Sequence, residues 1–205
     1  MSEVKLVWAT PDAERLIAYM ARVSNPPNQT NEASAPKLLR YLKEHKHWSP
    51  FEMVNVCMEI VVTRDIARQL LRHRSFSFQE FSQRYAVADG YELSEARLQD
   101  TKNRQNSIPV QDRELERRWH ELQENVLDHV KSAYEAALND GIAKEVARKL
   151  LPEGLTTSKM YMNGTLRSWM HYVSIRTGVE TQKEHREVAL QCQKILQDLF
   201  PSLEL

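Results

Sequence analysis

Glycine is scarce in this chain of 205 residues, which contains only five. None of the five belongs to a GxGxxG or a GxxxxGK[ST] pattern, so the sequence gives no support to a dinucleotide-binding turn or a P-loop. Cysteine is scarcer still: Cys57 and Cys192 lie far apart, each inside an apolar pattern. Their spacing fits neither a zinc site nor a CxxC redox motif, and we expect both to be buried free thiols.

Long apolar runs and an excess of one charge are also missing. No run approaches the roughly 18 apolar residues that suggest a membrane span, and the first residues lack the apolar core of a signal peptide. We therefore expect a cytoplasmic protein that does not enter a membrane. Lysine plus arginine equals aspartate plus glutamate at 28 each, so no overall positive field would hold nucleic acid. The hydrophobic fraction of 41% suffices for one domain spanning residues 1–205.

Hydrophobic periodicity predicts an α+β fold, a mostly helical single domain around a small antiparallel sheet. Strands are expected at 5–10 and at 51–63, where apolar and polar residues alternate. Residues 86–109 are polar and are expected to form an irregular excursion or a short hairpin. The apolar seam of the helix at 111–139 can pack internally or against a partner subunit. The expected helices are 11–24, one around 38–42, 64–74, 111–139, 141–152, 165–177 and 181–200.

The segment RHRSFSFQEFSQRY, residues 72–85, is the part of the sequence that ordinary packing explains least. The C-terminal end of a helix attracts cations, worth roughly 0.3 to 1 kcal/mol each, and this accounts for one or two of its charges. It does not account for Arg84, or for Glu80 and Ser82 in between. Guanidinium groups beside a hydroxyl suit a phosphate monoester, because arginine binds it bidentately and stays charged. We expect a small anionic ligand, with a solvated basic face as the alternative.

Four segments in order resemble the motifs of the flavin-dependent thymidylate synthase family. RHR followed after seven residues by Ser82 resembles the family signature. The other three are HWSPFEM (47–53), EVAR (145–148), and LRSWMHYVSIR (166–176) with TQKE (181–184). The resemblance runs from about residue 36 to the end of the chain. It implies reductive methylation of dUMP to dTMP, with methylenetetrahydrofolate as carbon donor, FAD as hydride carrier and NADPH as reductant, in a homotetramer whose active sites form between subunits.

The resemblance also implies roles for individual residues. It assigns Arg176 as the catalytic residue that activates the pyrimidine, places His47 on the flavin and folate side of the pocket, and implies no metal. Thr165 and Glu180 stand where the family commonly has asparagine and histidine. The residues assigned to dUMP are Gln69, Leu70, Leu71, Arg72, Glu80, Phe81, Ser82, Gln83, Arg84, Arg148 and Arg176. Those assigned to FAD are Ser49, Arg72, His73, Arg74, Glu80, Thr165, Leu166, Arg167 and His171.

Simpler interpretations of single residues stay open. Arg148 could form an ion pair with Glu145, three positions earlier on a helix. His171 could be an ordinary helix histidine, and Arg176 could interact with a helix C-terminus. Two other classes of function also remain: a nucleotide-binding or RNA-binding protein without chemistry, and a hydrolase with Ser82 as nucleophile. The hydrolase is the weaker of the two, because no G-x-S-x-G elbow or evident base accompanies Ser82.

Overall fold

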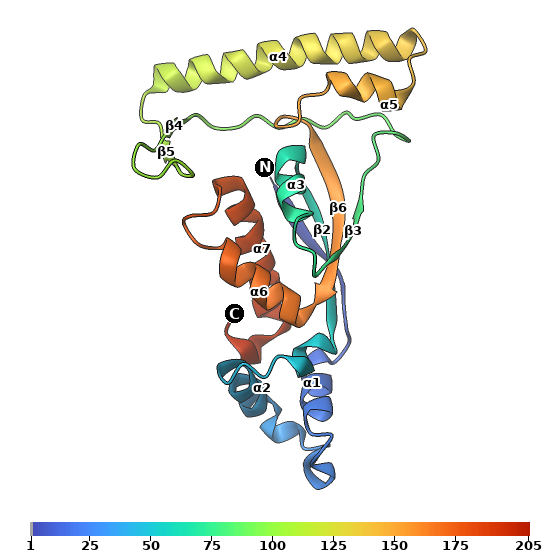
Figure 1. The fold of residues 1–205 in the computed structure, drawn as a ribbon, viewed down its shortest axis with the longest axis vertical. Coiled ribbons are helices and arrows are strands. Elements are labelled where there is room, and N and C mark those ends of the chain that lie inside the picture. The colour runs from blue at the N-terminus through green and yellow to red at the C-terminus, as the bar shows by residue number, and fades with distance from the viewer. Residues whose placement is uncertain (1) are drawn as a thin grey trace.

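A four-stranded antiparallel sheet organises the chain in the computed structural model, which describes residues 2–205 (Figure 1). Its strand order is β1-β2-β6-β3, and two further strands, β4 and β5, form a separate hairpin. The predicted α+β fold around a small antiparallel sheet is confirmed. Of the two alternatives for residues 86–109, an irregular excursion or a short hairpin, the hairpin forms over residues 97–109, and residues 86–96 are largely irregular. The strands are β1 (Glu3–Ala9), β2 (Asn55–Thr63), β3 (Ser77–Glu80), β4 (Arg97–Gln99), β5 (Ser107–Pro109) and β6 (Thr157–Thr165).

Helices make up most of the remaining regular structure, and several end earlier than the sequence predicts. The helix expected to reach residue 74 ends at Leu70, because the backbone turns there: the His73 N–H donates to the Leu70 carbonyl at 3.0 Å. The helix expected at 141–152 is only one turn long and continues as a 3-10 turn. The α-helices are α1 (Ala13–Ala21), α2 (Ala35–Glu44), α3 (Arg64–Leu70), α4 (Arg113–Asn139), α5 (Lys144–Ala147), α6 (Leu166–Arg176) and α7 (Lys183–Leu199).

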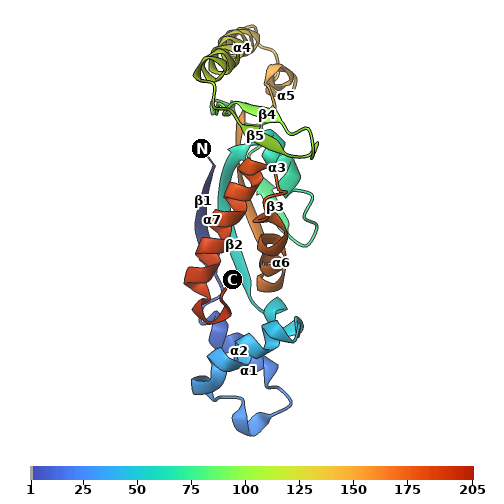
Figure 2. The ribbon, with the colours of Figure 1, turned by 90° about the vertical axis from the view of Figure 1, so that its left-hand side faces the viewer.

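One face of the sheet carries the core. The expected alternation on β2 is confirmed, although the strand begins at Asn55 because residues 49–52 form a 3-10 turn. Helices α3, α6 and α7 lie along this face (Figures 1 and 2). Its buried side chains on β2 and β6 include Val56, Met58, Ile60, Val62, Met160 and Met162. The sheet therefore serves as a platform that holds α3 and the two C-terminal helices together.

Strand β6 is central to the sheet, yet the sequence does not predict it. It pairs with β2 from Asn55–Thr165 to Thr63–Thr157 and with β3 on its other side. The Asn163-Gly164 dipeptide resembles a turn signal. Gly164 is needed for packing instead: a Cβ there would lie 2.4 Å from Cδ1 of Phe76. A glycine inside a strand can thus mark a close approach.

Helix α4 lies across one end of the molecule, beside α5 (Figure 1). Its apolar seam is largely uncovered, since Trp119, Leu122 and Val126 are 39%, 59% and 48% exposed. Of the two alternatives for this seam, internal packing is therefore wrong: the single chain leaves these side chains largely uncovered. Elsewhere, both cysteines are buried and free, as expected. None of the helices within residues 2–205 is long and apolar enough to cross a membrane.

Candidate active site

Arg176 and His73 meet where α6 ends and the turn after α3 begins. The Nε–H of Arg176 donates to Nε2 of His73 at 3.2 Å, so the RHR segment touches the C-terminal motif. His73 also packs edge-on against the Tyr172 ring, with 5.0 Å between ring centroids. Burial, together with the positive charge of Arg176, lowers the pKa of His73 to about 4. His73 is therefore neutral at neutral pH and can accept this hydrogen bond.

Gln69 connects α3 to the beginning of α7 beside this pair. Its Nε2 donates to Oε1 of Gln182 at 2.7 Å, and its Oε1 lies 3.2 Å from Nδ1 of His185. His185 is fully buried, and its ring lies 6.0 Å from that of His73. Burial, with a smaller effect of Arg176, lowers the pKa of His185 to about 4. Two neutral imidazoles thus contact the other two side chains: His73 contacts Arg176, and His185 contacts Gln69.

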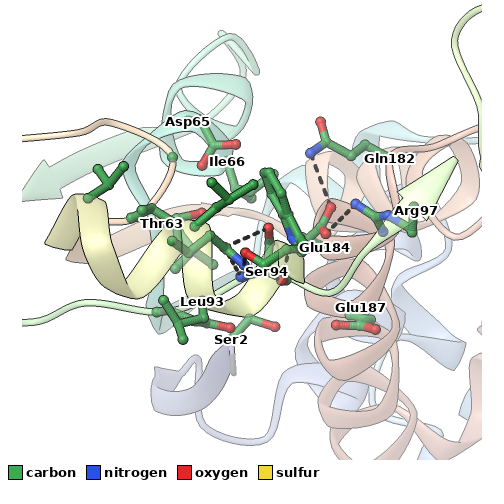
Figure 3. Close-up of a pocket in the computed structure, with 18 residues that line it drawn as sticks. Ser2, Thr63, Asp65, Ile66, Leu93, Ser94, Arg97, Gln182, Glu184 and Glu187 are labelled. Carbon is green, nitrogen blue, oxygen red and sulfur yellow. Dashed lines mark hydrogen bonds and ion pairs between the residues drawn. The ribbon is translucent and has the colours of Figure 1, made fainter. Parts of the chain in front are cut away.

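Gln182 and Glu184 also line a cavity of about 420 Å³ between α3, α4 and α7 (Figure 3). Figure 3 shows Gln182 and Arg97 both directed toward the Glu184 carboxylate. The resemblance marked the TQKE segment but gave these side chains no role. His185 was missed altogether, although it continues the buried stripe of α7 formed by Val188, Ala189, Cys192 and Leu196. A histidine in an apolar stripe was the signal that could have found it.

A second group of predicted residues gathers around α5. Nε of Arg84 lies 3.2 Å from the Glu145 carboxylate, whereas Nε of Arg148 donates to the Glu145 carbonyl at 3.3 Å. The expected alternative, an Arg148–Glu145 ion pair, is wrong, because Arg84 occupies that carboxylate. Ser82 lies beside them and accepts from the Arg84 backbone N–H at 3.4 Å. The group offers two guanidinium ions and a hydroxyl against one carboxylate, which suits an anionic ligand.

Glu80 has a different environment from its neighbours in the RHR segment. Its carboxylate lies 3.2 Å from NH1 of Arg64 and accepts from the Ser158 hydroxyl at 2.7 Å. Glu80 therefore holds Arg64, the first residue of α3, in place. Three other predicted residues contribute mainly to packing, because the side chains of Leu70 and Leu166 are fully buried and that of Gln83 is 5% exposed. Leu71 and Phe81, by contrast, are exposed.

The residues assigned to FAD lie in two places. Arg72 and Arg74 are exposed beside His73, and neither has an acidic partner within residues 2–205. Arg167 and His171 border a cavity of about 260 Å³ on α6, where Arg167 pairs with Glu52.

Other predicted residues nearby have structural contacts. Thr165 caps α6 through its hydroxyl, which accepts from the Ser168 N–H at 3.2 Å. His47 and Ser49 are exposed at the turn that precedes β2, where the His47 ring lies 6.0 Å from that of Tyr41.

The predicted dUMP residues do not converge within one chain. In residues 2–205, no hydrogen bond or ion pair joins the Arg84–Arg148 group to the Arg176–Gln69 group. Figure 1 shows α5 beside α4 at one end of the molecule and α6 along the sheet. The same residues contain no group of three or more histidine, cysteine or carboxylate side chains that could hold a metal ion.

Comparison with known proteins agrees with the resemblance seen in the sequence. A family model described as thymidylate synthase complementing protein matches residues 5–202. A flavin-dependent thymidylate synthase from Synechocystis sp. is 52% identical over 190 residues, which cover 93% of this chain and 87% of the relative. The chain belongs to the flavin-dependent thymidylate synthase family. Within the family, a probable flavin-dependent thymidylate synthase of Paramecium bursaria Chlorella virus 1 is 48% identical over 192 residues, 93% of this chain and 88% of that relative.

A solved structure shares the fold of this flavin-dependent thymidylate synthase family member almost completely. It is the UMP/dUMP methylase PolB from Streptomyces cacaoi bound with 5-Br dUMP. The TM-score is 0.87 at 27% sequence identity, covering 98% of this chain and 92% of PolB. The sequence resemblance to the family is thus confirmed by both sequence and fold.

Proposed function

We propose that this protein converts dUMP to dTMP by reductive methylation, with methylenetetrahydrofolate as carbon donor and NADPH as reductant by way of FAD. The observation that carries the proposal is the Arg176–His73 contact, which joins two family motifs at one point. In the overall reaction, the C5–H of dUMP is replaced by a methyl group. The methylene carbon needs two electrons to become methyl, and NADPH supplies them. The products are therefore dTMP, tetrahydrofolate and NADP⁺.

Arg176 is the residue that we assign to activate the pyrimidine. Its Nε is engaged by His73, whereas its two terminal nitrogens have no partner within residues 2–205. A guanidinium beside N3 of uracil would favour the N3-deprotonated form by direct attraction, and that form carries more electron density at C5. Because arginine is permanently charged, this effect requires no proton on the enzyme.

Neither cysteine is suited to attack the pyrimidine instead. Cys57 and Cys192 are both buried, and burial raises the pKa of each thiol. A thiol with a raised pKa is a poor source of the thiolate that acts as nucleophile. This supports activation at C5 without covalent attack by sulfur.

The group around α5 supplies the contacts to the nucleotide phosphate in our proposal. Arg84, Arg148 and Ser82 provide guanidinium and hydroxyl donors around one carboxylate. The hydrolase alternative gains nothing from this geometry, because the Arg84 N–H is the one hydrogen-bond partner of Ser82 Oγ within residues 2–205. Among residues 2–205, no base lies within hydrogen-bond distance of that hydroxyl to activate it.

The residues assigned to FAD are suited to binding it in their charge and in their hydrogen-bond donors. Arg72 and Arg74 are exposed and unpaired in the described chain, and a diphosphate takes two cations of this kind. Arg167, His171 and Ser49 would supply further donors. When bound, the flavin would carry hydride between the reductant and the one-carbon group. The protein residues would bind and orient the ligands and exclude water.

We further propose that the active site forms between chains of a homotetramer. The Arg84 and Arg176 groups are separate in one chain, and the apolar seam of α4 is exposed. Association of subunits would bury this seam and could bring the two groups from different chains to one nucleotide. The cytoplasmic location expected from the sequence stays a prediction.

The presence of a reducible flavin tests this proposal against the alternative of a nucleotide-binding or RNA-binding protein without chemistry. Purified protein should show flavin absorbance that bleaches when NADPH is added without oxygen. It should also bind dUMP in calorimetry. A protein that binds dUMP but neither takes up FAD nor oxidises NADPH would favour the alternative.

A further inference from the structure

A chain of hydrogen bonds with a single direction passes through Gln69 and joins Glu184 to His185. Arg97 forms an ion pair with Glu184, whose Oε2 accepts from Nε2 of Gln182 at 3.1 Å (Figure 3). Oε1 of Gln182 then accepts from Nε2 of Gln69 at 2.7 Å. Oε1 of Gln69 lies 3.2 Å from Nδ1 of His185.

The carboxylate of Glu184 at one end fixes the direction of this chain of hydrogen bonds. A carboxylate only accepts hydrogen bonds, so Glu184 requires the amide nitrogen of Gln182 to face it. The oxygen of Gln182 then faces Gln69, which must present its own nitrogen. The oxygen of Gln69 is left for His185, so Nδ1 of His185 must carry a proton. Each amide is thereby held in one of its two possible orientations.

His185 is suited to the far end. Its side chain is fully buried, and Nε2 has no partner within residues 2–205, so the ring has one donor contact and it goes to Gln69. The rings of His73 and Tyr172 lie 6.0 and 5.8 Å away. Burial and the nearby charge of Arg176 favour the neutral imidazole, which carries a single N–H.

We propose that His185 is a positioning residue, which together with Gln182 and Glu184 holds the Gln69 amide with its nitrogen available to the substrate nucleotide. Gln69 is half-buried, and one of its two N–H bonds is used by Gln182. The second N–H has no partner in the described part of the chain and can donate to an acceptor oxygen of the nucleotide. An amide free to rotate would present its oxygen for part of the time, and an oxygen facing another oxygen cannot form a hydrogen bond. This inference rests on the proposed function, because it takes dUMP as the ligand of Gln69.

Calorimetry with dUMP and FAD-loaded protein tests the inference. His185→Leu keeps the apolar packing but removes the donor, and we expect it to raise the Kd for dUMP roughly three- to tenfold, the effect of one lost hydrogen bond. His185→Gln retains an N–H at that position and should restore most of the affinity. Gln182→Leu changes an exposed side chain, so it should fold normally, and it should weaken dUMP binding in the same direction.

A double-mutant cycle separates positioning from a general structural effect. In a Gln69→Leu background, His185→Leu should change the Kd by less than about twofold, since its effect passes through Gln69. Cys192→Ala is the control: it truncates another buried side chain of α7 outside the chain of hydrogen bonds, and should leave dUMP affinity unchanged.

The possible failures are distinct. Wild-type protein that does not bind dUMP would overturn the proposed function, and this inference with it. Wild-type protein that binds dUMP while His185→Leu and Gln182→Leu bind it equally well would overturn the inference alone. An equal loss from His185→Leu with and without Gln69 would also overturn it, because His185 would then act by another route.

Discussion

Arg176 and His73 are 103 positions apart in the sequence, yet the guanidinium of one donates to the imidazole of the other at 3.2 Å. The contact fixes the Nε edge of Arg176 and leaves its terminal nitrogens without a partner in the described chain. It also requires a neutral His73, because a protonated imidazole has no lone pair to accept with. Orientation of the proposed catalytic arginine therefore depends on a residue of the RHR segment.

Replacement of Arg176 should separate the two halves of the reaction. We expect Arg176→Ala to lose methyl transfer by several powers of ten, while NADPH still reduces the flavin, because the charge acts on the pyrimidine. Arg176→Lys should rescue little, since an ammonium lacks the planar fork of donors. Stopped-flow measurement of each half-reaction checks this. Impaired flavin reduction with near wild-type methyl transfer from pre-reduced enzyme would assign the activating role elsewhere.

Acidification should destabilise the fold through two histidines, His73, which is half-buried, and His185, which is fully buried. The pKa values of His73 and His185 are lowered from 6.5 to about 4 in the folded chain. Between these values the unfolded chain binds more protons, so the free energy of unfolding should fall as pH drops from about 6.5 toward 4 and should not change from this cause above 6.5. Urea unfolding at about pH 7.5 and about pH 5 measures it. His185→Leu should lose less stability over this range than wild type, and an equal loss would contradict this account.

Arg84 should matter for dUMP and not for FAD. Arg84→Ala removes a charge-assisted contact to phosphate, and we expect dUMP affinity to fall by roughly 1.5 to 3 kcal/mol, about tenfold to a hundredfold. Arg117→Ala is a matched control, because it removes an exposed arginine that is paired with Glu114 and Glu121 on α4. Calorimetry with each ligand gives the answer. Unchanged dUMP affinity in Arg84→Ala would remove this residue from the site.

Mixed oligomers test whether the site is shared between chains. Arg84 and Arg176 lie in groups that are separate in one chain. At a dUMP concentration too low for Arg84→Ala to bind it, a mixture of Arg84→Ala and Arg176→Ala should therefore regain some activity if each intact group completes a site from a different subunit. Mass spectrometry of the mixture verifies that subunits have exchanged. Exchange without recovered activity would indicate that both residues serve a site from the same chain.

The sequence predicted β2 well, because its alternation of apolar and polar residues reflects a sheet with one buried face. It did not predict β6, where Asn163 and Gly164 resemble a turn and the need for glycine comes from the Phe76 ring. Contacts between residues far apart in the sequence could not be predicted either. Nothing local shows that the carboxylate of Glu145 pairs with Arg84 instead of Arg148.

Candidate residues came from the motifs, and their grouping came from the fold. The RHR segment and the C-terminal motif indicated which side chains are candidates for the chemistry, but the contact between His73 and Arg176 depends on how α3 and α6 pack on the sheet. His185 could have been noticed as a histidine in the apolar stripe of α7, but its role could not be predicted, because its partner Gln69 is 116 positions away. Roles of this kind require the three-dimensional arrangement.

Transfer of a labelled methylene group shows whether this protein methylates dUMP with NADPH as the reductant. Purified protein is incubated with dUMP, NADPH and methylenetetrahydrofolate labelled at the methylene carbon, and the nucleotide and folate products are separated by mass. We expect labelled dTMP together with tetrahydrofolate, formed only when NADPH is present and with one NADPH oxidised for each dTMP. Dihydrofolate as the folate product, or labelled dTMP without NADPH, would show that the folate itself is the reductant and would contradict the account.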